Sequence, residues 1–599
     1  MSAAEYRKLI VIVWLVVAVA MGALWGPKAW TGSSWDTDDF MRLVQVRDLL
    51  AGQAWSDLTQ HRLNPPDGTL MHWARLPDVP IALVTLALTP LLGARDALVA
   101  AAMLVPPLYL LPFLAFFAVA ARLMLGGARS PIALLVAIGG SISIVQFMPG
   151  RVDHHGLQLT AMMAAMMLLL AGVARRRWQQ AIAWAGVPFA LSVWIGAETL
   201  PLIAAWFAAL GLAWCHVGGR LARQGAMAGL LGAAIGIVIL VTSVPRPLWL
   251  SPACDAFSPV PIAMLALTGF GFAAMAMLGR WIATPAGRLG AAGVCGAAVA
   301  AAFAVAFPAC AHGGLEMVDP VVKRHWLDLV AEATPLFSQF RTQPFEALMD
   351  IWTPALGLAY CLWRMRRAGR RGRTLWGAVL VPLLAATALM AWQVRAASFA
   401  QELALLPLAG LASELWARIR RREPRWMAYA MAPLLLFVTS LLFWPSVGAA
   451  YGALAARLPG APRAGTMVTT ACAANGALAP LQDAAPSVIL SYIDIGSMIL
   501  FDTPHSVLGA PYHRDNAGLH ATIELFRSND DAWIKGKLGE LGVGWVVTCP
   551  GVEERSAFKT DGNDGLAERL AAGRVPDYLE PVPDPAEPGM KFYRVRAGE

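Results

Sequence analysis

The sequence predicts a polytopic α-helical membrane protein that ends in a mixed α/β domain, and three observations support this prediction. Hydrophobic residues make up 57% of the 599 residues and charged residues only 14%, whereas soluble domains are about a quarter charged. Apolar runs of about 17 to 25 residues recur from residue 9 to residue 447, which is long enough to span a bilayer. After residue 447 the sequence turns polar for about 150 residues, enough for one small domain. We therefore expect a membrane domain, 1–447, and an α/β domain, 448–599.

Each apolar run is expected to form a transmembrane helix unless it is too short. The run 79–93 is only 15 residues long and contains Pro80 and Pro90, so we expect an interfacial or re-entrant segment there. The first run lacks a small-x-small cleavage site and is one of many, which argues against a cleaved signal peptide. About thirteen spans remain, roughly at 9–26, 97–121, 131–149, 157–174, 181–197, 199–215, 226–245, 259–279, 288–308, 347–364, 375–393, 400–416 and 427–447.

The basic residues predict the orientation of these helices. The net charge is +8, but the arginines bunch in short loops between apolar runs, which is the positive-inside pattern and not a nucleic-acid-binding face. With 79–93 excluded as a span, all the basic loop clusters fall on one side of the membrane. The N-terminus is then cytoplasmic, and loops 27–96 and 309–346 and the C-terminal domain lie on the outer side. An arginine-rich, alanine-rich composition is typical of a bacterial protein, so we expect the bacterial inner membrane and a periplasmic C-terminal domain.

Four of the seven cysteines lie on the predicted outer side. Cys254 and Cys310 flank consecutive outer helix ends, and Cys472 and Cys549 both lie in the C-terminal domain. Disulfides 254–310 and 472–549 suit an oxidising periplasm. The alternative is that all seven cysteines are packing residues.

The first outer loop opens with a cluster of acids, Asp36, Asp38 and Asp39. Three carboxylates in four residues repel one another, and a divalent cation or a basic partner relieves the repulsion. The alternative is a solvated loop start in which Asp39 caps a helix at 40–50.

A second cluster, 149–156, lies in a short turn between two apolar runs and contains Asp153, His154 and His155. An aspartate and a histidine two residues apart can reach one ion, and oxygen with imidazole ligands suits Mn²⁺ or Mg²⁺. The alternative is helix capping with interfacial side chains.

Three single residues on the outer side are ordinary by themselves. Glu332 lies in the long polar loop 309–346, Arg395 lies just outside the span 375–393, and Glu198 lies at the end of 181–197. An interfacial role explains each of them equally well.

The C-terminal domain shows mixed α/β patterning. Strands are expected in the run that begins at Val488 and leads into Asp494 and Gly496, at 543–548 and at 591–595, and a helix is expected at 533–541. The first strand leads into Tyr492 and Asp494, and His505 and the segment 511–516 follow. These residues are candidates for acceptor binding, with a structural loop as the alternative. Glycine-rich phosphate loops and Ser-His-Asp signatures are absent from the sequence.

The order of these motifs on one side of a polytopic chain resembles the GT-C glycosyltransferases, specifically the catalytic subunit of archaeal and bacterial oligosaccharyltransferases. Asp36-Thr37-Asp38 resembles the acidic motif of the family's first outer loop, and Gly150 to His155 resembles its DxD-like motif. Leu329 to Glu332, followed by Pro335, is similar to the motif of the mobile fifth outer loop. Ser491 to Gly496 stands where the family has WWDYG.

The resemblance implies a role for each matched position. Asp38, Asp153 and His155 would bind a divalent metal, and Glu332 would complete the site and engage the acceptor together with Asp38. Arg395 would lie near the phosphate of a polyprenyl-linked sugar donor. The implied activity is inverting transfer of a sugar or oligosaccharide from a polyprenyl phosphate or diphosphate to a glycan, lipid or protein acceptor outside the membrane.

One motif departs from the family. The WWD triplet reads the hydroxyl of an Asn-x-Ser/Thr sequon, but here the matching residues are Tyr492, Ile493 and Asp494. Asparagine is therefore not the only expected acceptor, and the hydroxyl of a glycan, a lipid or a protein is an alternative.

Two other functions fit a polytopic chain. A transporter or flippase for a lipid-linked glycan predicts ionisable residues near mid-membrane and internal repeats. A scaffold that presents the C-terminal domain predicts no metal dependence and tolerance of Asp153→Ala.

Overall fold

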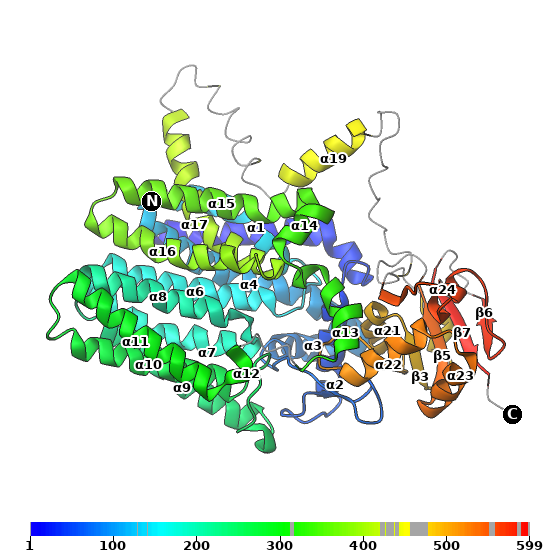
Figure 1. The fold of residues 1–599 in the computed structure, drawn as a ribbon. Helices are drawn as coiled ribbons and strands as arrows, with labels where there is room; N and C mark the ends of the chain where they lie inside the picture. The colour runs from blue at the N-terminus through cyan, green and yellow to red at the C-terminus, as the bar shows by residue number, and fades with distance from the viewer. Residues whose placement is uncertain are drawn as a thin grey trace.

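The computed structural model describes a bundle of long helices with an α/β domain at one end (Figure 1). The most N-terminal and central parts of the chain form the bundle, and the last part forms the α/β domain (Figure 1). The described residues are 2–127, 130–139, 142–311, 317–419, 426, 437, 443–455, 472, 477–549, 557–562, 564–583 and 589–596.

Nine helices in the described residues are long and apolar enough to cross a membrane, and each coincides with an expected span. Their sequences are apolar around the whole helix, as expected for helices in contact with lipid and with one another. They are α1 (Ala3–Trp30), α4 (Ala94–Leu125), α6 (His155–Ala174), α8 (Leu200–Val217), α9 (Leu221–Ser243), α10 (Pro259–Leu278), α11 (Pro285–Ala306), α16 (Arg370–Leu389) and α17 (Ala397–Ile419).

The other expected spans differ in form. The run 131–149 contains α5 (Ser130–Gly139) and the 3₁₀ helix η1 (Ile142–Phe147), and the run 181–197 contains the 3₁₀ helix η2 (Arg176–Ala185) and α7 (Gly186–Ile195). The run 347–364 is α15 (Pro344–Arg367), a full-length helix with acids near its start and arginines at its end. The run 427–447 lies outside the described residues except for Phe437 and the start of α19 (Phe443–Ala455). The short run 79–93 forms a 15-residue helix, α3 (Asp78–Leu92).

Several of the segments between the long helices gather at the end of the bundle nearest the α/β domain (Figure 1). The first of them holds α2 (Thr37–Leu50) and a two-stranded sheet, β1 (Thr59–Gln60) and β2 (Thr69–Leu70). The later ones contain the short 3₁₀ helices η3 (Ala197–Thr199), η4 (Arg246–Leu248), η5 (Leu327–Leu329), η6 (Ala331–Ala333) and η7 (Val394–Ala396), with α12 (Pro308–Ala311), α13 (Pro320–His325) and α14 (Leu336–Thr342).

The C-terminal domain contains a five-stranded mixed sheet in the order β4-β3-β5-β7-β6. β3 (Val488–Ser491) pairs in parallel with β4 (Ser506–Val507) and β5 (Val543–Thr548), while β7 (Lys591–Val595) runs antiparallel to β5 and to β6 (Leu579–Val582). The three expected strands are confirmed, and the helix expected at 533–541 is α23 (Asp531–Glu540). The remaining elements are the 3₁₀ helix η9 (Ile493–Ile495) and the helices α20 (Ala479–Gln482), α21 (Gly496–Asp502), α22 (Asn516–Arg527) and α24 (Leu566–Ala571).

The segment between α1 and α4, residues 31–93, shares one hydrophobic core with the C-terminal domain. Phe40, Met41 and Trp73 belong to the same buried cluster as Ile489 and Phe526. A side chain of this segment also reaches backbone carbonyls of α21, because Arg47 donates to the carbonyl oxygens of residues 500 and 501. The C-terminal domain is therefore packed directly onto segment 31–93.

Both expected cysteine pairings are present in the structure. Cys254 is bonded to Cys310, and Cys472 is bonded to Cys549. Cys215, Cys295 and Cys361 are buried and free.

Candidate active site

The acidic cluster at the start of α2 is organised by a helix cap. Asp36 is the cap residue, and its Oδ1 accepts hydrogen bonds from the backbone amides of Asp38 and Asp39, each at 3.0 Å. The Asp39 carboxylate accepts a bond from the Asp36 amide in return, at 3.2 Å. The expected cap, Asp39, is therefore corrected to Asp36, because a capping residue must precede the first helical turn. This arrangement leaves the Asp38 side chain free of cap contacts.

Asp39 connects α2 to the turn that contains the second motif. Its buried carboxylate accepts a bond from the backbone amide of Asp153, with 3.1 Å between Oδ1 and N. The Arg151 guanidinium donates to Asp39 at 3.2 Å and also to Asp36. These bonds place the two acidic motifs, more than one hundred residues apart in the chain, side by side.

Asp153, His154 and His155 form a compact group at the start of α6. Their ligand atoms all lie within 4.8 Å of one another. Asp153 Oδ1 lies 2.5 Å from His154 Nδ1, and Asp153 Oδ2 is bonded to His155 Nδ1. Burial raises the pKa of Asp153, but the neighbouring His154 and His155 outweigh burial and lower this pKa well below its ordinary value. Asp153 is therefore a buried carboxylate held in its charged form.

Glu198 completes this group from η3. Its Oε1 lies 3.2 Å from His154 Nε2 and 3.9 Å from His155 Nε2. From sequence alone Glu198 is expected to be an ordinary interfacial acid, because a single acid at the end of an apolar run has no partner within the run and no local signal distinguishes it.

Asp38 lies at the start of α2, where the charges of the second motif and of a later loop act on its carboxyl group. Burial and then the charges of Asp153, Asp36 and Glu332 raise the pKa of Asp38 well above its ordinary value, and His155 acts in the opposite direction. Asp38, Asp153, His155 and Glu332 therefore belong to one electrostatic group. The metal-binding and catalytic roles that the motif order implies for them stay predictions.

Glu332 and Arg395 form the other wall of the site. Glu332 Oε1 lies 3.5 Å from Arg395 Nη2, and the side chains are 56% and 33% exposed. Two backbone bonds hold their segments together, from Val394 N to the Thr334 carbonyl and from Leu336 N to the Met390 carbonyl, each at 2.9 Å. The exposed charges remain available to a ligand.

The residues at this site suit a divalent cation. The group of Asp153, His154 and His155 offers one carboxylate and imidazole nitrogens, a donor set that suits Mn²⁺, Zn²⁺ or similar ions. Burial and then the neighbouring carboxylates raise the pKa of Asp38, and a cation would relieve the repulsion among these carboxylates. Asp38, Asp153 and His155 are the residues expected to hold it, and Glu198 and His154 are added as neighbours.

The candidate acceptor residues of the C-terminal domain are placed differently from one another. Tyr492 is 1% exposed and packs against the rings of Phe526 and Phe558, with centroids 5.1 Å away in each case. His505 is fully buried and bonds the Leu481 carbonyl at 2.9 Å. Both side chains therefore pack in the core of the domain, whereas Asp494 is exposed, and an acceptor-binding role for the three residues stays a prediction.

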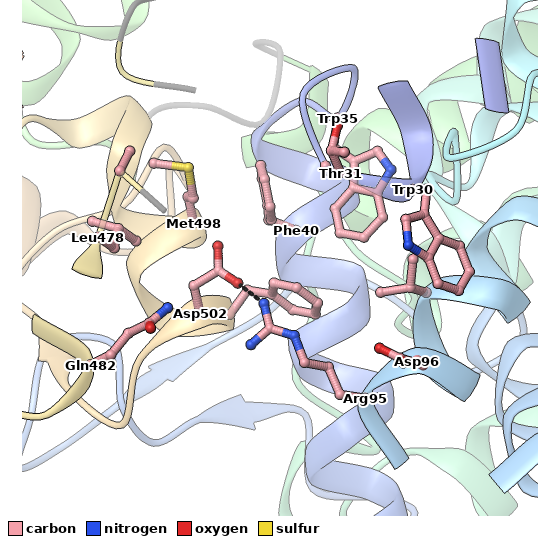
Figure 2. Close-up of a pocket in the computed structure, with 14 residues that line it drawn as sticks. Trp30, Thr31, Trp35, Phe40, Arg95, Asp96, Leu478, Gln482, Met498 and Asp502 are labelled. Carbon is pink, nitrogen blue, oxygen red and sulfur yellow. Dashed lines mark hydrogen bonds and ion pairs between the residues drawn. The ribbon is translucent and has the colours of Figure 1, made fainter. Parts of the chain in front are cut away.

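A cavity of about 220 Å³ lies on the boundary between the bundle and the C-terminal domain. Figure 2 shows Trp30, Trp35 and Phe40 on one side and Met498 and Asp502 on the other. An ion pair of 2.7 Å between Arg95 and Asp502 crosses this boundary. Trp35 and Phe40 precede and follow the acidic cluster, so the cavity adjoins the start of α2.

Comparison with known proteins gives a structural likeness only. No protein-family model and no curated protein sequence matches the chain. The structure is similar to the oligosaccharyltransferase AglB from Archaeoglobus fulgidus in complex with an inhibitory peptide and a dolichol-phosphate, with a TM-score of 0.67 and 14% identity over 96% of this chain and 72% of that chain.

Two other structures of the Archaeoglobus fulgidus oligosaccharyltransferase agree. The complex with zinc and sulfate has a TM-score of 0.63 and 14% identity, covering 95% of this chain and 71% of that chain. The form tethered to an acceptor peptide containing the NVT sequon has a TM-score of 0.65 and 14% identity, covering 100% and 74%. The chain therefore shares the fold of this archaeal oligosaccharyltransferase, which agrees with the fold class predicted from its sequence.

Proposed function

We propose that the protein is a metal-dependent, inverting glycosyltransferase. It transfers a sugar or oligosaccharide from a polyprenyl phosphate or diphosphate to an acceptor on the outer, periplasmic side of the bacterial inner membrane. The observation that carries the proposal is the meeting of Asp38, Asp153, His155, Glu332 and Arg395, from four distant parts of the chain, on a fold shared with a solved oligosaccharyltransferase.

The arrangement suits displacement at an anomeric carbon. An oxygen of the acceptor forms a bond to that carbon on the face opposite the phosphate, while the bond from the carbon to the phosphate oxygen breaks, so the configuration inverts. Asp38 and Glu332 orient the acceptor, and one of them takes its proton. Arg395 binds the departing phosphate by charge-assisted hydrogen bonds. A divalent cation, Mn²⁺ or Mg²⁺, would stabilise the negative charge that develops on the phosphate.

The proposed substrates rest partly on the ligands of the similar archaeal structures. The archaeal structures hold a dolichol-phosphate in one case, an acceptor peptide in another and zinc in a third. A polyprenyl-linked donor fits the position of the site at the end of the apolar helices (Figure 1). The acceptor is proposed to be a hydroxyl of a glycan, a lipid or a protein, because Tyr492 is buried where the family reads a sequon.

One observation favours the transporter alternative. Glu402 of α17 is fully buried within the bundle, and both its carboxylate oxygens lack a hydrogen-bond partner among the described residues. Ionisable residues inside membrane helices often serve transport. A transporter requires Glu402 and tolerates loss of Glu332, whereas the glycosyltransferase has the opposite requirements.

Complementation of a deletion strain tests the proposal. The strain receives wild type, Asp38→Ala, Asp153→Ala or Glu332→Ala, with Asp531→Ala as a control acid far from the site. Surface glycans and glycoproteins are then profiled by mass spectrometry. We expect one glycan species to return with wild type and Asp531→Ala and to be missing with the other three at equal protein levels. Full restoration by all three variants contradicts the proposal and favours a transporter or a scaffold.

A further inference from the structure

A short segment of the C-terminal domain, 510–516, contacts the start of the catalytic helix α2. The Tyr512 hydroxyl donates to the Thr37 carbonyl oxygen at 3.1 Å and lies 3.0 Å from the Ser497 hydroxyl. Thr37 stands between the cap residue Asp36 and Asp38. The Tyr512 ring is 2% exposed and packs edge-on against Trp73, with centroids 5.3 Å apart. Tyr512 therefore fixes the backbone to which the Asp38 side chain is attached.

The next two residues bind an acid from the bundle. The Arg514 guanidinium donates to both oxygens of Asp255, at 2.7 and 2.8 Å, and His513 Nε2 lies 2.7 Å from Asp255 Oδ2. The Asp255 side chain is only 8% exposed. Burial by itself raises the pKa of Asp255, but the hydrogen bonds from Arg514 and His513 outweigh burial and lower this pKa far below its ordinary value. This group of Asp255, His513 and Arg514 is called the clasp below.

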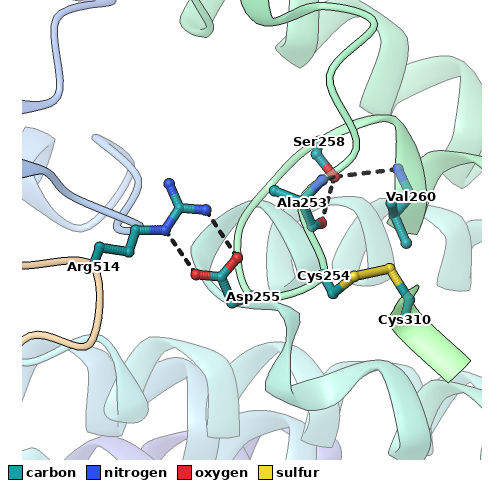
Figure 3. Close-up of a disulfide and its surroundings, with 7 residues drawn as sticks. All are labelled: Ala253, Cys254, Asp255, Ser258, Val260, Cys310 and Arg514. Carbon is teal, nitrogen blue, oxygen red and sulfur yellow. Dashed lines mark hydrogen bonds and ion pairs between the residues drawn. A yellow bond between two sulfur atoms is a disulfide. The ribbon is translucent and has the colours of Figure 1, made fainter. Parts of the chain in front are cut away.

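Asp255 is held in place by its own loop. Figure 3 shows Asp255 directly beside the disulfide between Cys254 and Cys310, with its carboxylate turned to Arg514. Ser258 closes the same loop, since its hydroxyl donates to the Ala253 carbonyl at 2.7 Å and accepts from the amides of Ala253 and Val260 at 3.2 Å. The disulfide and Ser258 thus leave Asp255 little freedom to move away from Arg514.

The same segment also contacts the loop 309–346 and, at a second point, the first loop. Asn516 accepts from the Asp319 amide at 2.9 Å and donates to the Met317 carbonyl at 3.0 Å, in the loop that later carries Glu332. Asp515 accepts from the Thr69 hydroxyl at 3.1 Å in the first loop. Segment 510–516 therefore joins three outer loops of the bundle.

We propose that Tyr512 is a positioning residue for Asp38, and that the clasp, anchored by the Cys254–Cys310 disulfide, holds Tyr512 against the Thr37 carbonyl. The inference rests on the proposed glycosyltransferase function, because positioning is measured through the reaction. Tyr512 does not touch the reacting atoms in this account; it sets the orientation of the first turn of α2.

The test uses full-length purified protein and membranes of the deletion strain, which contain the acceptor. A lipid extract of that strain, added in rising amounts, supplies the donor. The variants are Tyr512→Phe and Asp255→Asn. The matched controls are Tyr578→Phe, which removes a buried phenol bonded to Asp531 at 2.9 Å in the same domain, and Asp531→Asn, which breaks a distant arginine pair with Arg569. Protein amount and thermal midpoint are measured for each.

We expect Tyr512→Phe and Asp255→Asn to lower the maximal rate about five- to tenfold, the effect of one lost hydrogen bond on a barrier. The amount of extract that gives half the maximal rate should stay the same, and both controls should keep the wild-type rate. Equal rates for Tyr512→Phe and Tyr578→Phe overturn the inference while wild type remains active. Failure of the proposed function looks different, because wild type then forms no product or Asp153→Ala forms as much as wild type.

The disulfide provides an independent arm. The maximal rate of a Cys254→Ser, Cys310→Ser double variant should be reduced by the same factor as that of Asp255→Asn. Adding Asp255→Asn to the double variant should lower the maximal rate little further. If the separate losses multiply in the combined variant, the disulfide and the clasp act independently and their proposed coupling is overturned.

Discussion

The carboxylate of Asp39 accepts a hydrogen bond from the backbone amide of Asp153, with 3.1 Å between the two atoms. This one bond joins the helix that carries Asp38 to the turn that carries the histidines. Because Asp39 is fully buried, its loss leaves the Asp153 amide without this acceptor and removes one of the acceptors of the Arg151 guanidinium, which keeps its bond to Asp36.

Asp39→Ala should destabilise the protein by about 1–3 kcal/mol, the cost of unpaired buried polar groups. The transfer rate should fall with it, since Asp38 and Asp153 lose their connection. Asp39→Asn should keep part of the stability, because an amide oxygen still accepts from Asp153. The midpoint of thermal unfolding of the purified protein should fall in the order wild type, Asp39→Asn, Asp39→Ala. An Asp39→Ala variant that is as stable as wild type contradicts the role given to Asp39.

Arg395→Ala should weaken donor binding. A charge-assisted bond to phosphate contributes about 1.5–3 kcal/mol, so the donor concentration at half-maximal rate should rise at least about tenfold. Arg569→Ala is the control, because Arg569 pairs with Asp531 far from the site. The amount of lipid extract that gives the half-maximal rate is measured for both variants. An unchanged amount for Arg395→Ala argues against a contact between Arg395 and the donor phosphate.

The contact between α22 and α13 should depend on pH through His520. Its ring lies 3.0 Å from Asp319 Oδ1 and 3.1 Å from Glu524 Oε1. Burial lowers the pKa of His520, but the hydrogen bond to Asp319 and the charge of Glu524 outweigh burial and raise this pKa above its ordinary value. The stabilisation is therefore fully present below the unfolded pKa, about 6.5, and is lost as pH rises through the raised folded pKa.

Hydrogen exchange of peptides from 317–330, corrected for intrinsic rates, measures this contact. Protection should fall as pH rises from about 6 to 8. In His520→Gln the protection should not change over this range. If His520→Gln loses as much protection as wild type when the pH rises, the pH dependence belongs to another group and the role given to His520 is contradicted.

Glu402→Met should stabilise the protein while leaving transfer unchanged. The variant removes a fully buried carboxyl whose oxygens lack partners among the described residues, and such a group costs about 1–3 kcal/mol. The thermal midpoint and the transfer rate are measured on the same preparation. Loss of function in a more stable Glu402→Met variant would support the transporter alternative.

Much of the fold could be predicted from sequence because apolar length is a direct physical requirement of the bilayer. The helices that match expected spans, such as α1 and α4, are long and uninterrupted. The run 181–197 was harder, because η2 and α7 divide it where packing and not hydropathy decides the backbone. In the C-terminal domain, β-branched runs located β3, β5 and β7 correctly.

The site was predictable only through motifs that resemble a family. The charges of Asp153 and Glu332 act on Asp38, which agrees with the grouping that those motifs imply, while the roles of the three residues stay predictions. Glu198 and Tyr512 could not be found in this way, since their roles come from contacts between segments far apart in the chain. The burial of Tyr492 and His505 could not be predicted for a related reason: a polar side chain beside a strand end looks the same in sequence whether it faces an open site or the core.

The most direct measurement is the transfer reaction itself with purified protein. Lipid extract of the deletion strain is the donor, its delipidated cell envelope is the acceptor source, and the loss of lipid-linked glycan is followed by mass spectrometry together with the new product. Wild type and Asp531→Asn should consume the lipid-linked glycan and form the product, and Asp153→Asn should form at least about a hundredfold less, as expected when a group that organises the reacting charges is lost. Equal product from Asp153→Asn and wild type would contradict the assignment of this site as the centre of a glycosyltransferase.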